Sequence, residues 1–60
     1  MNNKKIKLML RGNGIPQWKL AEAMNVSEIT VQRLLRNDEK ELPKQKQDEI
    51  IKLVDSLIRL

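Results

Sequence analysis

Five residues near the middle of this 60-residue chain carry side chains suited to reading the edges of base pairs. The guanidinium group of Arg33 can form two hydrogen bonds with guanine O6 and N7, the amide of Gln32 can pair with adenine N6 and N7, and Arg36 belongs to the same set. Ile29 can pack on a thymine methyl group, and Glu28 can accept a hydrogen bond from cytosine N4, although its charge also repels phosphate. This chemistry requires that the five side chains share one exposed surface.

A helix over residues 28–36 would provide that surface. Val31, Leu34 and Leu35 follow the i, i+3, i+4 spacing of a buried helical face. The base-reading candidates then fall largely on the opposite face. A polar stripe on a helix is most often its solvated side, and that alternative stays open. An exposed Ile29 within the stripe favours a contact surface over a simply solvated one.

A second helix and a tight turn precede this helix and would position it. Pro16 suits the first turn of a helix over residues 16–24, because its missing N–H would be unpaired there in any case. Asn25 tolerates positive φ and is expected to end that helix, and Ser27 is expected to cap the next one. A turn this short forces the two helices to cross at a steep angle, where the small Ala21 fits.

Two further helices are expected, over residues 3–11 and 44–60. Asn3 can cap the first of them, and Gly12-Asn13-Gly14 ends it. No segment alternates with period two, so no strand is expected. The sequence therefore predicts one all-α domain over residues 1–60, a compact bundle of four helices in which the second and third form a helix-turn-helix. The residues expected to face its core are Ile6, Met9, Leu10, Leu20, Ala21, Met24, Val26, Val31, Leu34, Leu35, Ile50, Ile51, Val54, Leu57 and Ile58.

Residues 17–27 carry a recognisable pattern. Their sequence, Gln-Trp-Lys-Leu-Ala-Glu-Ala-Met-Asn-Val-Ser, resembles the helix-turn-helix of the phage Cro/CI repressor-like family, also called XRE-like. The departures are Asn25 in place of the usual Gly, Pro16 where a hydroxyl cap is common, and one C-terminal helix where longer relatives have two. The resemblance implies sequence-specific binding of double-stranded DNA by a small Cro-like transcriptional regulator of a phage or mobile element, with a palindromic operator.

Contacts to the DNA backbone are expected at the start of the second helix, where unpaired N–H groups and the helix dipole favour phosphate. Gln17 lies there and matches the family's phosphate-contacting glutamine. Trp18 lies beside it, and either contacts a DNA strand or packs against the first or last helix at the edge of the core. For each lysine among the weaker candidates, a simply solvated charge is the alternative. These weaker candidates are Lys19, Ser27, Thr30, Lys44 and Lys46.

The net charge supports a polyanionic partner, but weakly. Twelve Lys and Arg residues against eight Asp and Glu residues give a net charge of +4, and the isoelectric point is near 9.8. Many small helical domains reach such values without binding nucleic acid. Asp38, Glu39 and Glu41 form an acidic cluster after the third helix, where we expect a solvated loop that points away from the phosphates.

Catalytic, metal-dependent and membrane roles have little support in the sequence. The chain has no His and no Cys, and it lacks a phosphate-cradling glycine loop, so we expect no enzymatic activity, metal, cofactor or small-molecule substrate. Asp48 and Glu49 are adjacent and therefore do not share a helical face for acid–base work. No apolar run approaches the roughly 20 residues of a membrane span, and the absence of cysteine suits a reducing cytoplasm.

The last helix predicts a homodimer. Leu53 and Leu60 lie off the apolar stripe of that helix and Leu57 borders it, so more apolar surface remains than one small core requires. Leu53, Leu57 and Leu60 are therefore the expected interface. The alternative is that Leu53 is a singly exposed residue and that Leu60 frays at the chain end, which needs no further explanation.

Two alternative functions stay open. The first is a protein-interaction module, such as an antirepressor, in which Ile29, Leu53 and Leu60 contact a partner protein. The second is an architectural or excisionase-like role in DNA binding. Salt dependence separates DNA binding from the first alternative, because release of counterions from phosphates makes DNA binding weaken steeply as salt rises.

Overall fold

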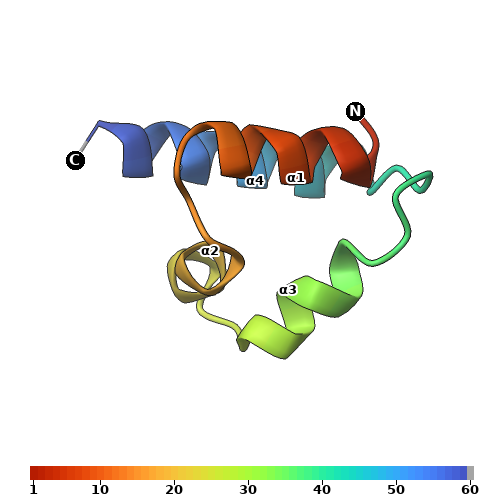
Figure 1. The fold of residues 1–60 in the computed structure, drawn as a ribbon, viewed down its shortest axis with the longest axis horizontal. Helices are drawn as coiled ribbons and strands as arrows, with labels where there is room; N and C mark the ends of the chain where they lie inside the picture. Colours follow the sequence, from red (N-terminus) through yellow and green to blue (C-terminus); the bar gives the residue numbers. More distant parts are fainter. Residues whose placement is uncertain (60) are drawn as a thin grey trace.

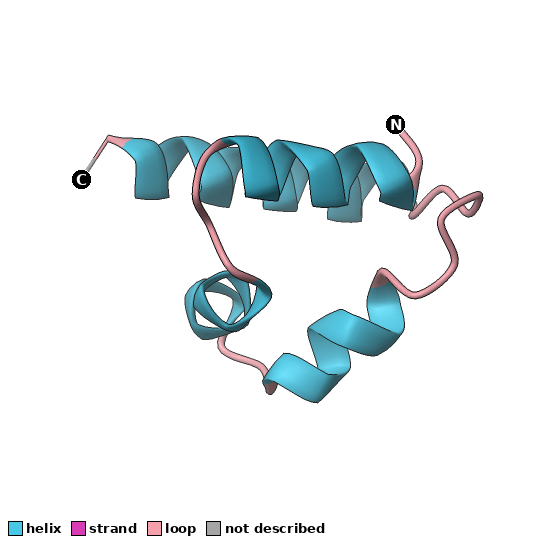
Figure 2. Ribbon diagram, viewed as in Figure 1, coloured by secondary structure: helices cyan, strands magenta, loops and turns pink. Residues whose placement is uncertain are grey.

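The computed structural model describes residues 1–59, which form four helices (Figure 1). Apart from one isolated bridge between Asn2 and Glu41, the described segments between the helices are loops and turns (Figure 2). The predicted all-α fold is therefore confirmed. The helices are α1 (Asn3–Gly12), α2 (Gln17–Met24), α3 (Glu28–Leu34) and α4 (Lys44–Ile58).

The arrangement of the helices leaves α3 on one side of the molecule. α2 packs against both α3 and α4. In Figure 1, α2 is seen almost end-on while α3 runs obliquely across the view, so the two helices cross steeply, as the short turn between them predicts. α1 lies in front of α4, and it extends from above the start of α2 to the loop that follows α3.

The turn between α2 and α3 has the geometry expected from its residues. Asn25 adopts the left-handed conformation with φ of 61°, which an asparagine tolerates better than most residues. The side chain of Ser27 accepts a hydrogen bond from the backbone N–H of Thr30 at 3.2 Å and so caps α3. Both predictions are confirmed, and both rest on interactions within a few residues of sequence.

The start of α1 differs from the expectation by one residue. Asn2, not Asn3, caps this helix, because its side chain accepts from the backbone N–H of Lys5 at 3.0 Å. Asn3 is instead fully buried. Its amide nitrogen donates to the carbonyl oxygens of Leu34, the last residue of α3, at 3.1 Å and of Asn37, in the loop that follows, at 2.9 Å. The cap shifts because Asn3 is used for this distant contact.

The core draws on every helix, but three of its expected members lie at the surface. Val26 in the α2–α3 turn is 40% exposed, and Ile51 and Ile58 on α4 are 41% and 53% exposed, so the expectation that they face inward is wrong. On α4 the inward face has the spacing i, i+3, i+4, i+7, and a residue one position further along lies about 100° around the helix. That face consists of Ile50, Leu53, Val54 and Leu57.

Two apolar loop residues, Ile15 and Leu42, join the core although they lie outside the helices. Leu42 is 4% exposed and lies two residues before the start of α4, and its carbonyl oxygen accepts from Gln47 Nε2 of that helix at 2.7 Å. The burial of these two loop residues was not predicted, because helical spacing identifies core residues only within helices. The buried apolar residues are Ile6, Leu10, Ile15, Leu20, Ala21, Val31, Leu35, Leu42, Ile50 and Val54.

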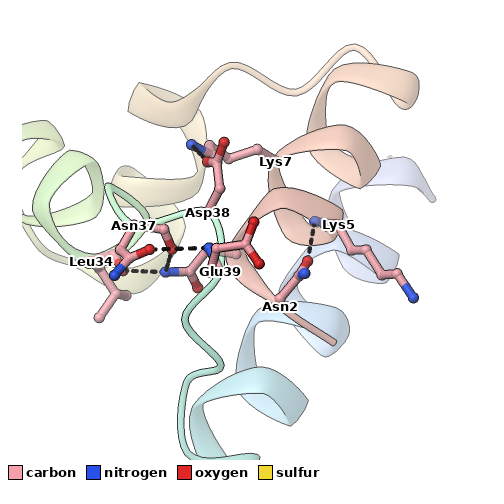
Figure 3. A network of polar contacts seen from close by, with 8 residues as sticks. Asn2, Lys5, Lys7, Leu34, Asn37, Asp38 and Glu39 are labelled. Atoms are coloured by element: carbon pink, nitrogen blue, oxygen red, sulfur yellow. Dashed lines mark hydrogen bonds and ion pairs between the residues drawn. The ribbon is translucent and has the colours of Figure 1, made fainter.

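The loop after α3 folds back onto the start of α1. The backbone N–H of Asn3 donates to Lys40 O at 2.8 Å, and that of Lys4 donates to Asp38 O at 3.1 Å. Asp38 forms an ion pair with Lys7 (Figure 3), and Glu41 pairs with the N-terminal ammonium group at 3.2 Å. The acidic cluster is exposed as expected, but Asp38 is paired with α1 and Glu41 with the residue Met1 that precedes it, so these two carboxylates are not simply solvated.

Within residues 1–59 no helix combines the length and apolar character needed to cross a membrane. The acidic residues of the same segment form no group of three that could hold a metal ion.

Candidate nucleic-acid interface

The two faces of α3 are separated as the sequence predicts. Val31 is fully buried and Leu35, just after the helix, is 1% exposed. Ile29 on the outer side is 58% exposed, and the polar residues of the stripe are exposed as well. A singly exposed isoleucine is ordinary on a protein surface, so the polar side chains beside it are what make this face suited to contact. The exposed members of this reading face are Glu28, Ile29, Gln32, Arg33 and Arg36.

The first turn of α3 carries a weakly held polar pair. Gln32 Nε2 donates to Glu28 Oε2 at 3.5 Å, and both side chains are exposed. A bond of this length in solvent contributes little to stability, so an incoming donor or acceptor can replace it at small cost. Glu28 also lies where the helix dipole favours a negative charge. The arrangement leaves the amide of Gln32 able to pair with a base edge.

The hydroxyl groups at the start of α3 are engaged with each other. Ser27 Oγ and Thr30 Oγ1 lie 2.8 Å apart, and either can be the donor. Ser27 is also occupied as the helix cap. Thr30 is exposed and borders a concave surface on the outer side of α3, which makes it the better of these two candidates for a phosphate contact.

At the start of α2, Gln17 lies between two kinds of anion-binding group. The cap residue is Pro16, and no hydrogen bond from a described side chain caps the helix. The half-buried Gln17 lines a concave surface together with Lys7 and Arg11 of α1. Cations and helical N–H groups both attract phosphate, so this surface suits a DNA strand.

Trp18 remains accessible at the turn. The side chain is 51% exposed, and it lines a shallow concave surface together with Glu22 of α2, Val26 of the turn and Glu28 of α3. This placement favours the alternative in which the indole is available for contact, over packing against α1 or α4. The carboxylates of Glu22 and Glu28 make this surface less suited to phosphate than the surface near Gln17.

The lysine candidates differ in their surroundings. Lys19 on α2 and Lys44 at the start of α4 are exposed. Lys46 Nζ pairs with Glu49 Oε2 at 2.9 Å, which makes it the poorest phosphate candidate of the three.

Sequence reasoning did not single out two further residues of this candidate surface. Asn37 and Lys40 line the concave surface that also includes Thr30, Arg33 and Arg36. Three cationic side chains therefore border one hollow beside the reading face. Lys40 lies between acidic neighbours in the sequence, so no local signal identifies it. The fold-back of the loop turns Asp38 toward α1 and leaves Lys40 on the α3 side.

Asp38 is the titratable group with a clear electrostatic perturbation in this region. The hydrogen bond from the Lys7 ammonium group holds the pKa of the Asp38 carboxyl below its ordinary value. Lys4 also lowers this pKa through its charge. The carboxylate is thus ionised at neutral pH and neutralises Lys7, which leaves Lys4 as the unpaired neighbour among the described contacts.

Comparison of the chain with models of known protein families, with curated protein sequences and with solved structures finds no match.

The expected dimer residues on α4 are less exposed than predicted. Leu53 and Leu57 are half-buried and pack against the core of their own chain, and Leu60 lies outside the described residues. The exposed apolar residues of α4 are Ile51 and Ile58. They are seven positions apart, which places them on nearly the same face of the helix.

Proposed function

We propose that this chain is a sequence-specific double-stranded DNA-binding protein in which α2 and α3 form a helix-turn-helix. The observation that carries the proposal is the exposed stripe on α3, in which Arg33 lies nearly opposite the buried Val31. A helix with one anchored face and one face of bidentate donors has the form required to enter a major groove.

In this proposal the base contacts come from α3. Arg33 pairs with guanine, Gln32 exchanges its contact to Glu28 for an adenine edge, and Ile29 packs on a thymine methyl group. Arg36 extends the contact toward the end of the helix. The backbone contacts come from Gln17 at the start of α2 and from the cationic hollow beside α3, and they hold the protein in register without specifying sequence.

The biological role that fits best is that of a small Cro-like transcriptional regulator acting in the cytoplasm by binding alone, without a catalytic step. We propose that it binds a palindromic operator as a homodimer, because two-fold symmetric sites match two-fold symmetric proteins. The exposed Ile51 and Ile58 are the α4 residues best placed to meet a second copy. Ile51 and Ile58 are therefore better candidates for the dimer interface than the half-buried Leu53 and Leu57.

A second candidate function is a protein-interaction module. It is favoured by the exposed Trp18 and Val26, which line one shallow surface at the α2–α3 turn, and by the exposed Ile29 on α3. Exposed apolar side chains that lie close together are typical of protein-binding surfaces.

Selection of bound sequences from random duplex DNA tests the proposed function. The expected result is a recovered motif with two symmetric half-sites and an affinity that falls steeply with salt. Binding without a recovered motif would favour an architectural role. Failure to enrich any duplex, together with salt-insensitive binding of a protein partner, would favour the protein-interaction module.

A further inference from the structure

The whole net charge of the chain is carried by its first twelve residues. Four of the twelve cationic residues and none of the eight acidic residues lie in this segment, so the other eight cations balance the eight acids. The four are Lys4, Lys5, Lys7 and Arg11, all on α1. The net charge of +4 is therefore a property of one helix and not of the surface in general.

Three of these cations share one face of α1. At about 100° per residue, Lys4, Lys7 and Arg11 fall within an arc of about 60°, whereas Lys5 lies about 100° or more from each of them. Figure 3 shows Lys5 and Lys7 extending to different sides of α1. The three cations, which we call the α1 stripe, line one concave surface together with Leu8 and Asp38.

Two members of the α1 stripe are available to an anionic partner. Lys7 is paired with Asp38, the carboxylate that borders this surface. Lys4 and Arg11 are exposed and form no ion pair with any residue of the described chain. Unpaired cations on a concave surface attract phosphate groups through charge and hydrogen bonding.

The position of the α1 stripe connects it to the candidate interface at both ends. Arg11 and Lys7 share a concave surface with Gln17 at the start of α2. At the other end, the backbone N–H of Lys4 bonds to Asp38 in the loop that follows α3. Figure 1 shows α1 extending from one of these points to the other. A strand held at Gln17 therefore meets further positive charge along α1.

We propose that the α1 stripe is a second phosphate-binding surface, which holds the DNA backbone beyond the base pairs contacted by α3. The proposal rests on the proposed DNA-binding function. A lipid surface suits this helix less well, because Ile6 and Leu10 of α1 are buried in the core, and a membrane-bound helix needs a free apolar face. The stripe contributes affinity without base preference, since phosphate contacts carry no sequence information.

A pair of charge-matched double variants tests this proposal. Lys4→Gln/Arg11→Gln removes two charges from the stripe, and Lys5→Gln/Lys52→Gln removes two charges from elsewhere. Binding of each to one selected duplex and one unrelated duplex is measured across a salt series. For the stripe variant, we expect the slope of log affinity against log salt to become shallower by about 1 to 2, with the base preference unchanged. The control variant should keep the wild-type slope.

Two further measurements keep the outcomes distinct. Thermal melting checks that each variant folds. If the double variant does not fold, the single variants Lys4→Gln and Arg11→Gln replace it, and each should give about half of the slope change. Equal slope changes in the stripe and control variants would overturn the proposal, because α1 would then act only through total charge. If the stripe variant keeps the wild-type slope of log affinity against log salt, and Arg33→Ala loses base preference, the α1-stripe proposal is overturned while the proposed function stays intact.

Failure of the proposed function gives a different pattern. In that case the wild-type chain would bind neither duplex in a salt-dependent manner. Binding to phosphatidylserine vesicles that is lost in the stripe variant would then assign the stripe to an anionic lipid surface, and this result would overturn the DNA assignment.

Discussion

The two ends of α3 are held in different ways. At its start, Ser27 caps the helix and Asn25 makes the turn, so the interactions that position it lie within a few residues. At its end, the amide of Asn3 binds the carbonyl oxygens of Leu34 and Asn37, which are 31 and 34 residues away in the sequence. The start of the helix is thus positioned by local chemistry, and its end by a contact between distant parts of the chain.

The two ends also present different surfaces. Around the start of α3 the surface contains the exposed Trp18 and Val26 and the carboxylates of Glu22 and Glu28. Beside the later part of the helix it contains Arg33, Arg36 and Lys40. In the proposed complex, the cationic side chains beside the later part of α3 attract phosphate, whereas the carboxylates near the turn repel it.

Removing the distant contact should have the largest effect on stability. Asn3→Ala leaves two part-buried carbonyl groups without this donor and should lower the free energy of unfolding by about 1 to 3 kcal/mol. Urea denaturation measures the change. Asn13→Ala is the matched control, because its amide bonds to Met9 O at an exposed site, and it should change stability by about 0.5 kcal/mol or less. Equal effects of the two variants would contradict the assigned role of Asn3.

Arg33→Ala tests the exposed face of α3 and leaves the contacts that hold this helix in the fold unchanged. We expect a loss of about 1 to 3 kcal/mol of discrimination at one base position per half-site. The melting temperature should stay nearly unchanged, because the side chain is exposed. Selection of bound sequences with Arg33→Ala measures the change, and Lys52→Ala on α4 serves as the control. If Arg33→Ala leaves base preference intact, α3 does not read the groove.

Ser27→Ala breaks the local anchor at the start of α3. Loss of the bond to the backbone N–H of Thr30 should cost about 1 kcal/mol of stability. Ser56→Ala, within α4, is the control, because it removes a hydroxyl without removing a cap. Urea denaturation compares the two. We expect Ser27→Ala to lower stability less than Asn3→Ala does. A larger loss would mean that the start of α3 is held more strongly than its end.

The ion pair between Lys7 and Asp38 predicts a pH dependence at the far end of α3. Because the pKa of Asp38 is lowered in the folded chain, the pair stabilises the fold at neutral pH. That stabilisation is lost as the pH falls below the ordinary Asp value of about 3.9 and through the lowered value. The wild-type chain should therefore lose more stability than Asp38→Asn between neutral pH and about pH 3. If the free energies of unfolding of the wild-type chain and of Asp38→Asn fall in parallel with pH, the ion pair contributes nothing to stability.

The smallest effect is expected at Asn25. Asn25→Gly removes the cost of positive φ but adds freedom to the unfolded chain, so stability should change by only about a few tenths of a kcal/mol. Ala23→Gly, at an exposed site within α2, should instead lose about 1 kcal/mol. Thermal melting distinguishes the two variants. Substantial destabilisation by Asn25→Gly would mean that the asparagine side chain itself stabilises the turn.

Much of the helical framework could be predicted from the sequence, because it depends on neighbouring residues. The left-handed Asn25 and the Ser27 cap follow from properties of single side chains. The two faces of α3 follow from helical spacing, with Val31 inside and Arg33 outside. These features are decided over one or two turns of helix, a range that a sequence pattern can describe.

Tertiary structure decided those features for which the local sequence allowed more than one conformation or orientation of a residue. The apolar residues of α4 span an arc of about 160°, which is wider than the buried face, so the pattern alone did not determine that Ile50 faces inward and Ile51 outward. Lys40 and Asp38 lie two residues apart, and the fold-back onto α1 separates them onto two surfaces. Asn3 could cap a helix or be buried, and the carbonyl groups at the end of α3 required a donor there. Each choice depends on contacts with residues that are distant in sequence, which a local helical pattern does not describe.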